Sequence, residues 1–256
     1  MQIPKRRWDK YTEAHRRVQR KAAEELAEYY DTLPWEGNEP LAEQLLRQKA
    51  TELAARYGIA DAALSAGMYD ELMEMWGADV PPAEVIEADT DYVSRDVQGA
   101  VRRARTRETA RSMASGALAG HVKRAGVETM RHNAVRDRAM WAWVCIGDSC
   151  AFCRVLGSRG WQPASRSMVA GHHAEHVHDN CDCQIMVKKP GESLDIEGYD
   201  PDALKREYEN TSGKTSKDSI NEMRRSDYTS EYADRRNARR RELYAQAHQP
   251  DESATE

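Results

Sequence analysis

The sequence predicts an α+β protein, with a helical N-terminal region followed by a small metal-clipped β unit and a helical or disordered C-terminal tail. Three observations favour this class. Apolar residues recur at three- and four-residue steps through most of the first 122 positions, as in amphipathic helices. A continuous apolar run at 140–146 breaks that period, and the composition becomes polar after residue 190. We therefore expect three parts, at 1–92, 93–190 and 191–256.

The first helix is predicted over residues 4 to 32, because one apolar stripe runs along this segment from Trp8 through Leu26 to Tyr29. Two interpretations of this stripe stay open. The helix either packs onto the body of the protein through the stripe, or forms an arm that docks on a partner.

Two further helices are predicted at about 40–57 and 61–76. Pro40 suits the first turn of a helix and Gly58 suits its end, so we expect the two helices to be separate. The helical pattern resumes from Val93 and continues to about residue 122, with small residues that permit close packing of helices.

The β unit is predicted from short segments whose period is no longer helical. The run 140–146 contains two tryptophans and is typical of a strand buried on both faces. Segments 160–162 and 184–187 are expected to add further short strands. Cys145 lies inside the first strand and is expected to be a core thiol.

A paired cluster of metal-type residues lies at the ends of these strands. Cys150 and Cys153 form a C-x-x-C, and His178, Cys181 and Cys183 form an H-x-x-C-x-C. Thiolate and imidazole ligands in two such clusters favour a tetrahedral zinc ion. We predict that Cys150, Cys153 and His178 bind it together with one of Cys181 or Cys183. The metal would be structural, because four protein ligands leave no open position for water.

Other interpretations of these cysteines are weaker. Disulfides between the two clusters are an alternative, but no signal peptide opens the chain, which favours metal or reduced thiols. His173 and Glu175 spell the H-x-E of zinc deaminases, yet the C-x-x-C precedes them instead of following. A nucleophilic Cys150 would need a histidine base, and a second thiol already explains that residue better.

The charge distribution is the second informative feature. The net charge is −5, yet residues 61–94 carry nine acidic and no basic side chains, whereas 95–138 carry eleven basic and four acidic ones. The basic segment either pairs with the acidic one or faces nucleic acid. The candidate nucleic-acid-binding residues are Arg102, Arg103, Arg105, Arg107 and Arg111, together with Arg235, Arg236, Arg239, Arg240 and Arg241 in the tail.

The tail is expected to contain a short helix at about 201–208, a linker at 211–216 and a charged helix at 217–247. Its apolar residues are too sparse for a core, so we expect it to become ordered against a partner. No apolar run approaches the length of a membrane span, so no membrane contact is expected.

The segments WVCIGDSCAFCRVLGSRGW and HDNCDCQIMV resemble the Mu F-like minor head proteins of tailed bacteriophages, in the form carried by phages of actinobacteria. The resemblance covers roughly residues 95 to 190. In that family the second cluster usually reads H-P-x-C-R-C, whereas this chain has Asp179 and Asp182 in place of the proline and the arginine. The metal-type residues are kept.

The resemblance implies a non-enzymatic minor capsid protein, made in the host cytoplasm and carried in the capsid interior near the portal. Its expected partners are the portal protein, the major capsid or scaffolding protein and packaged DNA without sequence preference. A capsid maturation protease is the alternative, although no Ser/His/Asp arrangement or H-E-x-x-H is recognisable. A DNA-binding regulator with a zinc knuckle is a third possibility.

Overall fold

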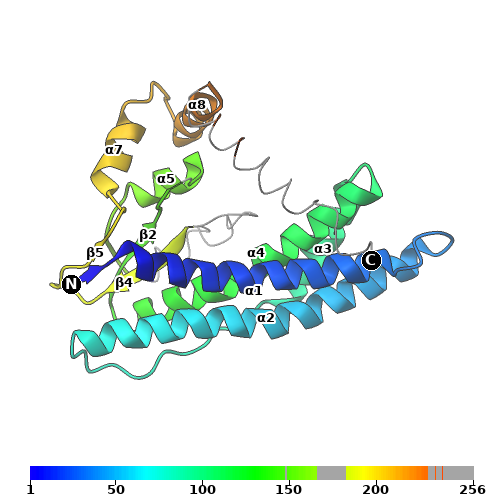
Figure 1. Ribbon diagram of the computed structural model, residues 1–256, viewed down its shortest axis with the longest axis horizontal. Coiled ribbons are helices and arrows are strands. Elements are labelled where there is room, and N and C mark those ends of the chain that lie inside the picture. Colours follow the sequence, from blue (N-terminus) through cyan, green and yellow to red (C-terminus); the bar gives the residue numbers. More distant parts are fainter. Residues whose placement is uncertain (148, 166–182, 230–233, 235–237, 239–256) are drawn as a thin grey trace, which may run out of the picture.

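A computed structural model describes residues 1–147, 149–165 and 183–229, together with Asp234 and Ala238. Most of this part of the chain is helical. Figure 1 shows the long helices lying alongside one another, with a small sheet at one end of them. The expected α+β class is therefore confirmed as long helices combined with a small sheet.

The long helices are α1 (Lys5–Asp31), α2 (Glu39–Met75), α3 (Thr90–Arg103) and α4 (Arg107–Arg136). Their apolar stripes meet in one core, whose fully buried members are aliphatic or alanine side chains, among them Ala22, Leu26, Leu46, Leu53, Val93, Val97, Leu118 and Val122. A second core joins the opposite end of the bundle to the sheet.

Helix α1 packs on the bundle, so the first interpretation of its stripe is confirmed and the free-arm interpretation is wrong. Trp8 is 4% exposed and Leu26 is fully buried. His15 and Asp61 form a buried pair between α1 and α2, with Nδ1 and Oδ1 2.9 Å apart. Before α1, strand β1 (Gln2–Ile3) pairs in parallel with β5 (Asp195–Ile196), which fastens the start of the chain.

Helix α2 is continuous, so the two separate helices predicted around Gly58 are wrong. The side chain of Asn38 caps its start by accepting a hydrogen bond from the Leu41 amide. Gly58 lies at a close helix contact instead of a stop. A Cβ there would lie 3.1 Å from the Cβ of Ala88 and 3.4 Å from that of Ala125.

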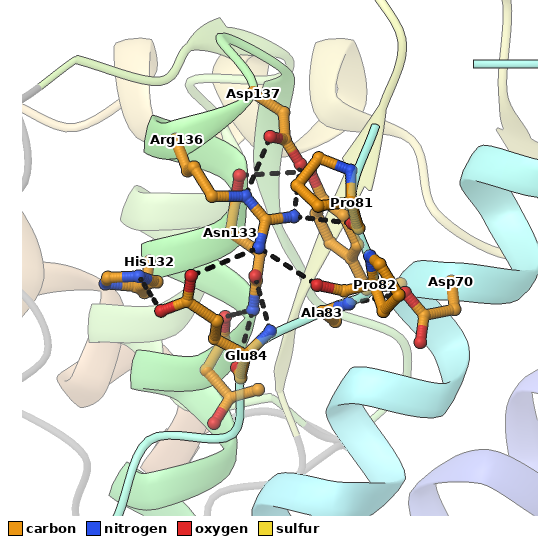
Figure 2. A network of polar contacts seen from close by, with 11 residues as sticks. Asp70, Pro81, Pro82, Ala83, Glu84, His132, Asn133, Arg136 and Asp137 are labelled. Atoms are coloured by element: carbon orange, nitrogen blue, oxygen red, sulfur yellow. Dashed lines mark hydrogen bonds and ion pairs between the residues drawn. The ribbon is translucent and has the colours of Figure 1, made fainter. Parts of the chain in front are cut away.

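The segment between α2 and α3 runs as an extended strap along α4 (Figure 2). Asn133 binds the strap as a neighbouring strand would, because its Oδ1 accepts from the Glu84 amide at 2.8 Å and its Nδ2 donates to the Glu84 carbonyl at 2.8 Å. Thr129 Oγ1 accepts from the Ile86 amide at 2.9 Å. Asp70 on α2 accepts from the Ala83 amide at 2.7 Å. These bonds satisfy backbone groups that have no strand partner.

Arg136 completes the strap (Figure 2). Its guanidinium donates to the carbonyls of Pro81 and Pro82 at 2.8 and 3.0 Å, and also binds Asp137. The Tyr69 hydroxyl lies 2.6 Å from Oδ2 of Asp137. Burial opposes ionisation of Asp137, but hydrogen bonds from Arg136 and Tyr69 outweigh it and hold the pKa of this carboxyl below its usual range.

The sheet has the order β3-β2-β4, with both pairings antiparallel. Strand β2 (Met140–Val144) is central, which confirms the strand predicted at 140–146. Strand β4 (Gln184–Lys188) also confirms its prediction, and β3 (Gln162–Pro163) lies slightly later than expected. A short helix, α5 (Ala151–Gly157), lies between β2 and β3 and was not predicted.

The described part of the tail forms α7 (Pro201–Glu209) and α8 (Ser216–Thr229). The short helix predicted at 201–208 is confirmed. The expectation that the tail contributes to no core is wrong, because Met223 of α8 is 3% exposed and packs on Ala151 and Val155 of α5. Of the helices in the described part, none is long and apolar enough to cross a membrane.

Candidate metal centre and basic surface

The sequence predicted that the C-x-x-C lies on a turn at the end of a strand. In the structure it lies at the start of helix α5. Cys150 is the N-cap residue, and its Sγ accepts a hydrogen bond from the Cys153 amide at 3.5 Å. Cys150 is partly exposed, whereas Cys153 is 1% exposed. A backbone N–H directed at sulfur favours the thiolate, the form that binds metal.

Cys183, the member of the second cluster that the structure describes, lies close to the start of α5. It immediately precedes β4, and its Sγ donates to the hydroxyl of Ser149 at 3.3 Å. Ser149 is adjacent to Cys150 in the chain, so the start of β4 and the start of α5 are neighbours. The fold thus places Cys183 beside the residue that precedes the C-x-x-C.

The other two predicted ligands, His178 and Cys181, lie outside the described residues. Within the described ranges, no group of three or more His, Cys, Asp or Glu side chains is arranged to hold a metal ion. No disulfide joins the four cysteines that the structure describes to one another. The donors present are those that zinc prefers, and they need ligands from the second cluster to complete a tetrahedron.

Cys145 is a core thiol, as predicted. It is 5% exposed, and its Sγ donates to the carbonyl of Cys153 at 3.0 Å. This bond ties the end of β2 to the C-x-x-C helix. It also makes Cys145 a natural control for experiments on the candidate ligands.

Arg154 is a residue of this region that the sequence analysis missed. It is 8% exposed, donates to the Ser149 carbonyl at 3.0 Å, and pairs with Asp227 of α8 at 2.8 Å and Glu207 of α7 at 3.1 Å. Burial raises the pKa of Glu207, and Arg154 only partly offsets that effect. The only sequence signal was a lone arginine within the apolar segment AFCRVLG.

The predicted basic residues of α3 and α4 are exposed, or partly exposed in the case of Arg111, and are engaged in ion pairs. Arg102 lies 3.3 Å from Glu43, and Arg111 lies 2.9 Å from Asp31. Likewise, Arg103 lies 3.8 Å from Asp96 and Arg107 lies 3.4 Å from Glu36. None of these four carboxylates belongs to the 61–94 segment. The pairing with that segment, one of the two alternatives, holds for Arg136, which lies 3.6 Å from Glu84, but not for these four arginines.

Exposure of these arginines still leaves a basic surface. The side chains of Arg102 and Arg103 are each 63% exposed, and Arg105 is also exposed. Exposed ion pairs of this kind are worth little, so phosphate can displace the carboxylates. The tail residues Arg235, Arg236, Arg239, Arg240 and Arg241 lie outside the described residues.

A small cavity of about 220 Å³ lies beside this surface, where α1 ends and α4 begins. Tyr30, Leu33 and Trp35 supply its apolar wall. Its charged lining has both signs, because two arginines (Arg107, Arg111) are accompanied by Asp31 and Glu108. The cavity therefore does not favour an anion.

Comparison with known proteins gives one result. The family model described as VG15 protein matches residues 2–211, a range that includes the helical bundle, both cysteine clusters and α7. No curated protein and no solved structure matches the chain. Since the matched range is well over half of the sequence, the chain belongs to the VG15 family, a family of phage proteins.

Proposed function

We propose that this chain is a non-enzymatic minor head protein of a tailed phage, and that it associates with the portal during procapsid assembly. The observation that carries the proposal is the Mu F-like cysteine pattern inside a phage-family chain. The C-x-x-C opens α5, and Cys183 opens β4 beside it. The proposed destination is the capsid interior near the portal.

A structural zinc ion is part of the proposal. Cys150, Cys153 and one of Cys181 or Cys183 would hold it with His178, and the ion would supply only cross-linking. The described sheet is small, with strands of two to five residues. A sheet of this size gains stability from a bound metal that joins its loops.

Contact with packaged DNA is the other part. The exposed arginines from 102 to 111 would meet phosphates without reading bases. Binding should weaken steeply as salt rises, because each neutralised phosphate releases counterions. An affinity for short duplexes that stays flat between low and moderate salt would remove this part and leave the arginines as partners of their carboxylates.

The proposal is tested by capture from cells that co-express the full chain with the portal, scaffolding and coat proteins of its phage. We expect an affinity tag on this chain to retain portal protein. A tagged, unrelated helical protein is the control for non-specific retention. Capture of no head protein at all would contradict the proposal. Cleavage of the coat protein that depends on this chain would instead favour the maturation protease.

A further inference from the structure

The outer side of α2 has an apolar face that no element of the described part of the chain covers. Between Arg56 and Asp70 the only charged residue is Asp61, which points inward and is 1% exposed. Ile59 is 46% exposed, although it is a large aliphatic side chain in the middle of a helix. Around it the exposed positions of the same face are Ala60, Ala63 and Gly67.

No packing contact within the described part of the chain requires glycine at position 67. A Cβ at this position would meet nothing within 4 Å, whereas one at Gly58 would press on the strap and α4, and one at Gly126 on α2. Glycine in a helix interior costs about 1 kcal/mol relative to alanine. At Gly67 no closer packing within the described part of the chain compensates for this loss of stability. What the glycine does create is a shallow notch on the exposed face, one turn beyond Ala63.

The face is complementary to itself when turned end to end. Ile59 and Gly67 lie equally far from Ala63 on its two sides, and so do Arg56 and Asp70. In an antiparallel pair of helices with its two-fold axis at Ala63, each Ile59 would therefore face the notch at Gly67 of the other copy. Each Arg56 would face an Asp70 of opposite charge. Isologous contacts need this kind of self-complementarity.

We propose that a second copy of this chain docks on this face, with the two α2 helices antiparallel and Ala63 on the two-fold axis. The two flanking charged residues, Arg56 and Asp70, are exposed and can therefore pair with the second copy. Arg56 is 51% exposed although it also contacts Glu25, and Asp70 is exposed although it accepts from the Ala83 amide.

The contact is short, which sets its strength. Further from the axis, Glu52 would face Glu74, and this like-charge pair limits the contact to the stretch from Arg56 to Asp70. That stretch is roughly 20 Å of helix. It buries less surface than a standard stable interface of about 800 Å² on each partner. The dimer therefore forms at high concentration, or where several copies are held together.

Sedimentation equilibrium of the full chain over a concentration series tests the proposal. We expect a reversible monomer–dimer equilibrium for the wild type, and monomer at every concentration for Ile59→Asp and for Gly67→Leu. A Cβ at position 67 meets nothing within 4 Å, so the leucine occupies the notch on the exposed face of α2. Helix content by circular dichroism checks that both variants fold. Leu41→Asp changes an equally exposed leucine near the start of α2, and should keep the dimer.

A cross-link locates the axis. Ala63→Cys places two thiols at the two-fold, so mild oxidation should give a disulfide that joins position 63 of one copy to position 63 of the other. Glu24→Cys, at an exposed position of α1, should give far less of its own product. The proposal is wrong if the wild type is monomeric throughout, if Ile59→Asp dimerises as the wild type does, or if the two engineered cysteines cross-link equally.

Discussion

At the scale of single residues, Asn133 is fully buried and bonds both backbone groups of Glu84. Its amide replaces a strand partner for Glu84, yet nothing in its helical period sets it apart. Arg154 was missed for the same reason, because periodicity reports burial and not side-chain to backbone bonds. The cysteines could be identified as candidate metal ligands from the sequence, because C-x-x-C spacing is itself typical of metal sites. Their placement at a helix start could not be predicted, because α5 has too few residues for a period.

Replacing Cys150 by serine should remove bound zinc. The wild type is expected to hold a single zinc ion, since one tetrahedron uses the four predicted ligands. Elemental analysis of reduced, extensively dialysed protein measures this directly. Cys145→Ser is the matched control, because Cys145 is a core thiol bonded to the Cys153 carbonyl and should leave the metal in place. Zinc-free wild-type protein, or equal loss in both variants, would contradict the site.

Acid should weaken the contribution of Asp137. Its pKa in the folded protein is lowered, so its stabilising effect is fully present above the ordinary unfolded value of about 3.9 and is lost as pH falls through the folded value. The stability gap between wild type and Asp137→Asn in urea unfolding should therefore shrink from about pH 6 to about pH 3. A gap that stays constant over this range would show that the charge of Asp137 contributes nothing.

At the level of whole elements, the helices were predictable and their connections less so. Gly58 was taken for a helix end because glycine weakens helices, but at this position it allows close packing against Ala88 and Ala125. The extended strap carries no periodic pattern at all. Its course depends on bonds from Asn133, Thr129 and Arg136, which lie far away in the sequence.

Asn133→Leu should destabilise the strap. Two backbone groups of Glu84 would lose their partner, at a cost of about 1 kcal/mol for each bond, because both bonds are only partly buried and water can replace part of them. Urea unfolding measures the loss in free energy. His132→Ala is the neighbouring control, since its 3.1 Å pair with Glu84 joins side chains that are 45% and 60% exposed. Equal effects of the two changes would mean that the strap is not held by Asn133.

Arg154→Met should loosen the tail. Methionine keeps much of the apolar stem but removes the charge that pairs with Asp227 and Glu207. Amide hydrogen exchange should then rise in α8 while the four-helix bundle stays protected. Arg206→Met changes an exposed arginine of α7, 4.0 Å from Asp200, and should leave exchange in α8 unaltered. Unchanged protection of α8 in Arg154→Met would show that the ion pairs of Arg154 do not hold this helix.

For the molecule as a whole, the helical character of the first part was readable from its apolar period, but the assembly of its parts was not. No local pattern indicates that β1 pairs with β5, because the two strands are short and almost two hundred positions apart. The apolar stripe of α1 also left a docking arm open, whereas that stripe is committed to α2 and α4. The outer face of α2 and the exposed arginines of α3 and α4 are among the surfaces of the described part that stay open to partners.

The position of this chain in purified procapsids tests the central claim most directly. Procapsids assembled with the full chain would be imaged by electron cryomicroscopy without imposed symmetry, and compared with particles assembled without it. We predict additional density inside the shell at the portal vertex, together with this chain in the particle's mass spectrum. A chain absent from procapsids, or density spread evenly over the shell, would contradict a portal-associated minor head protein.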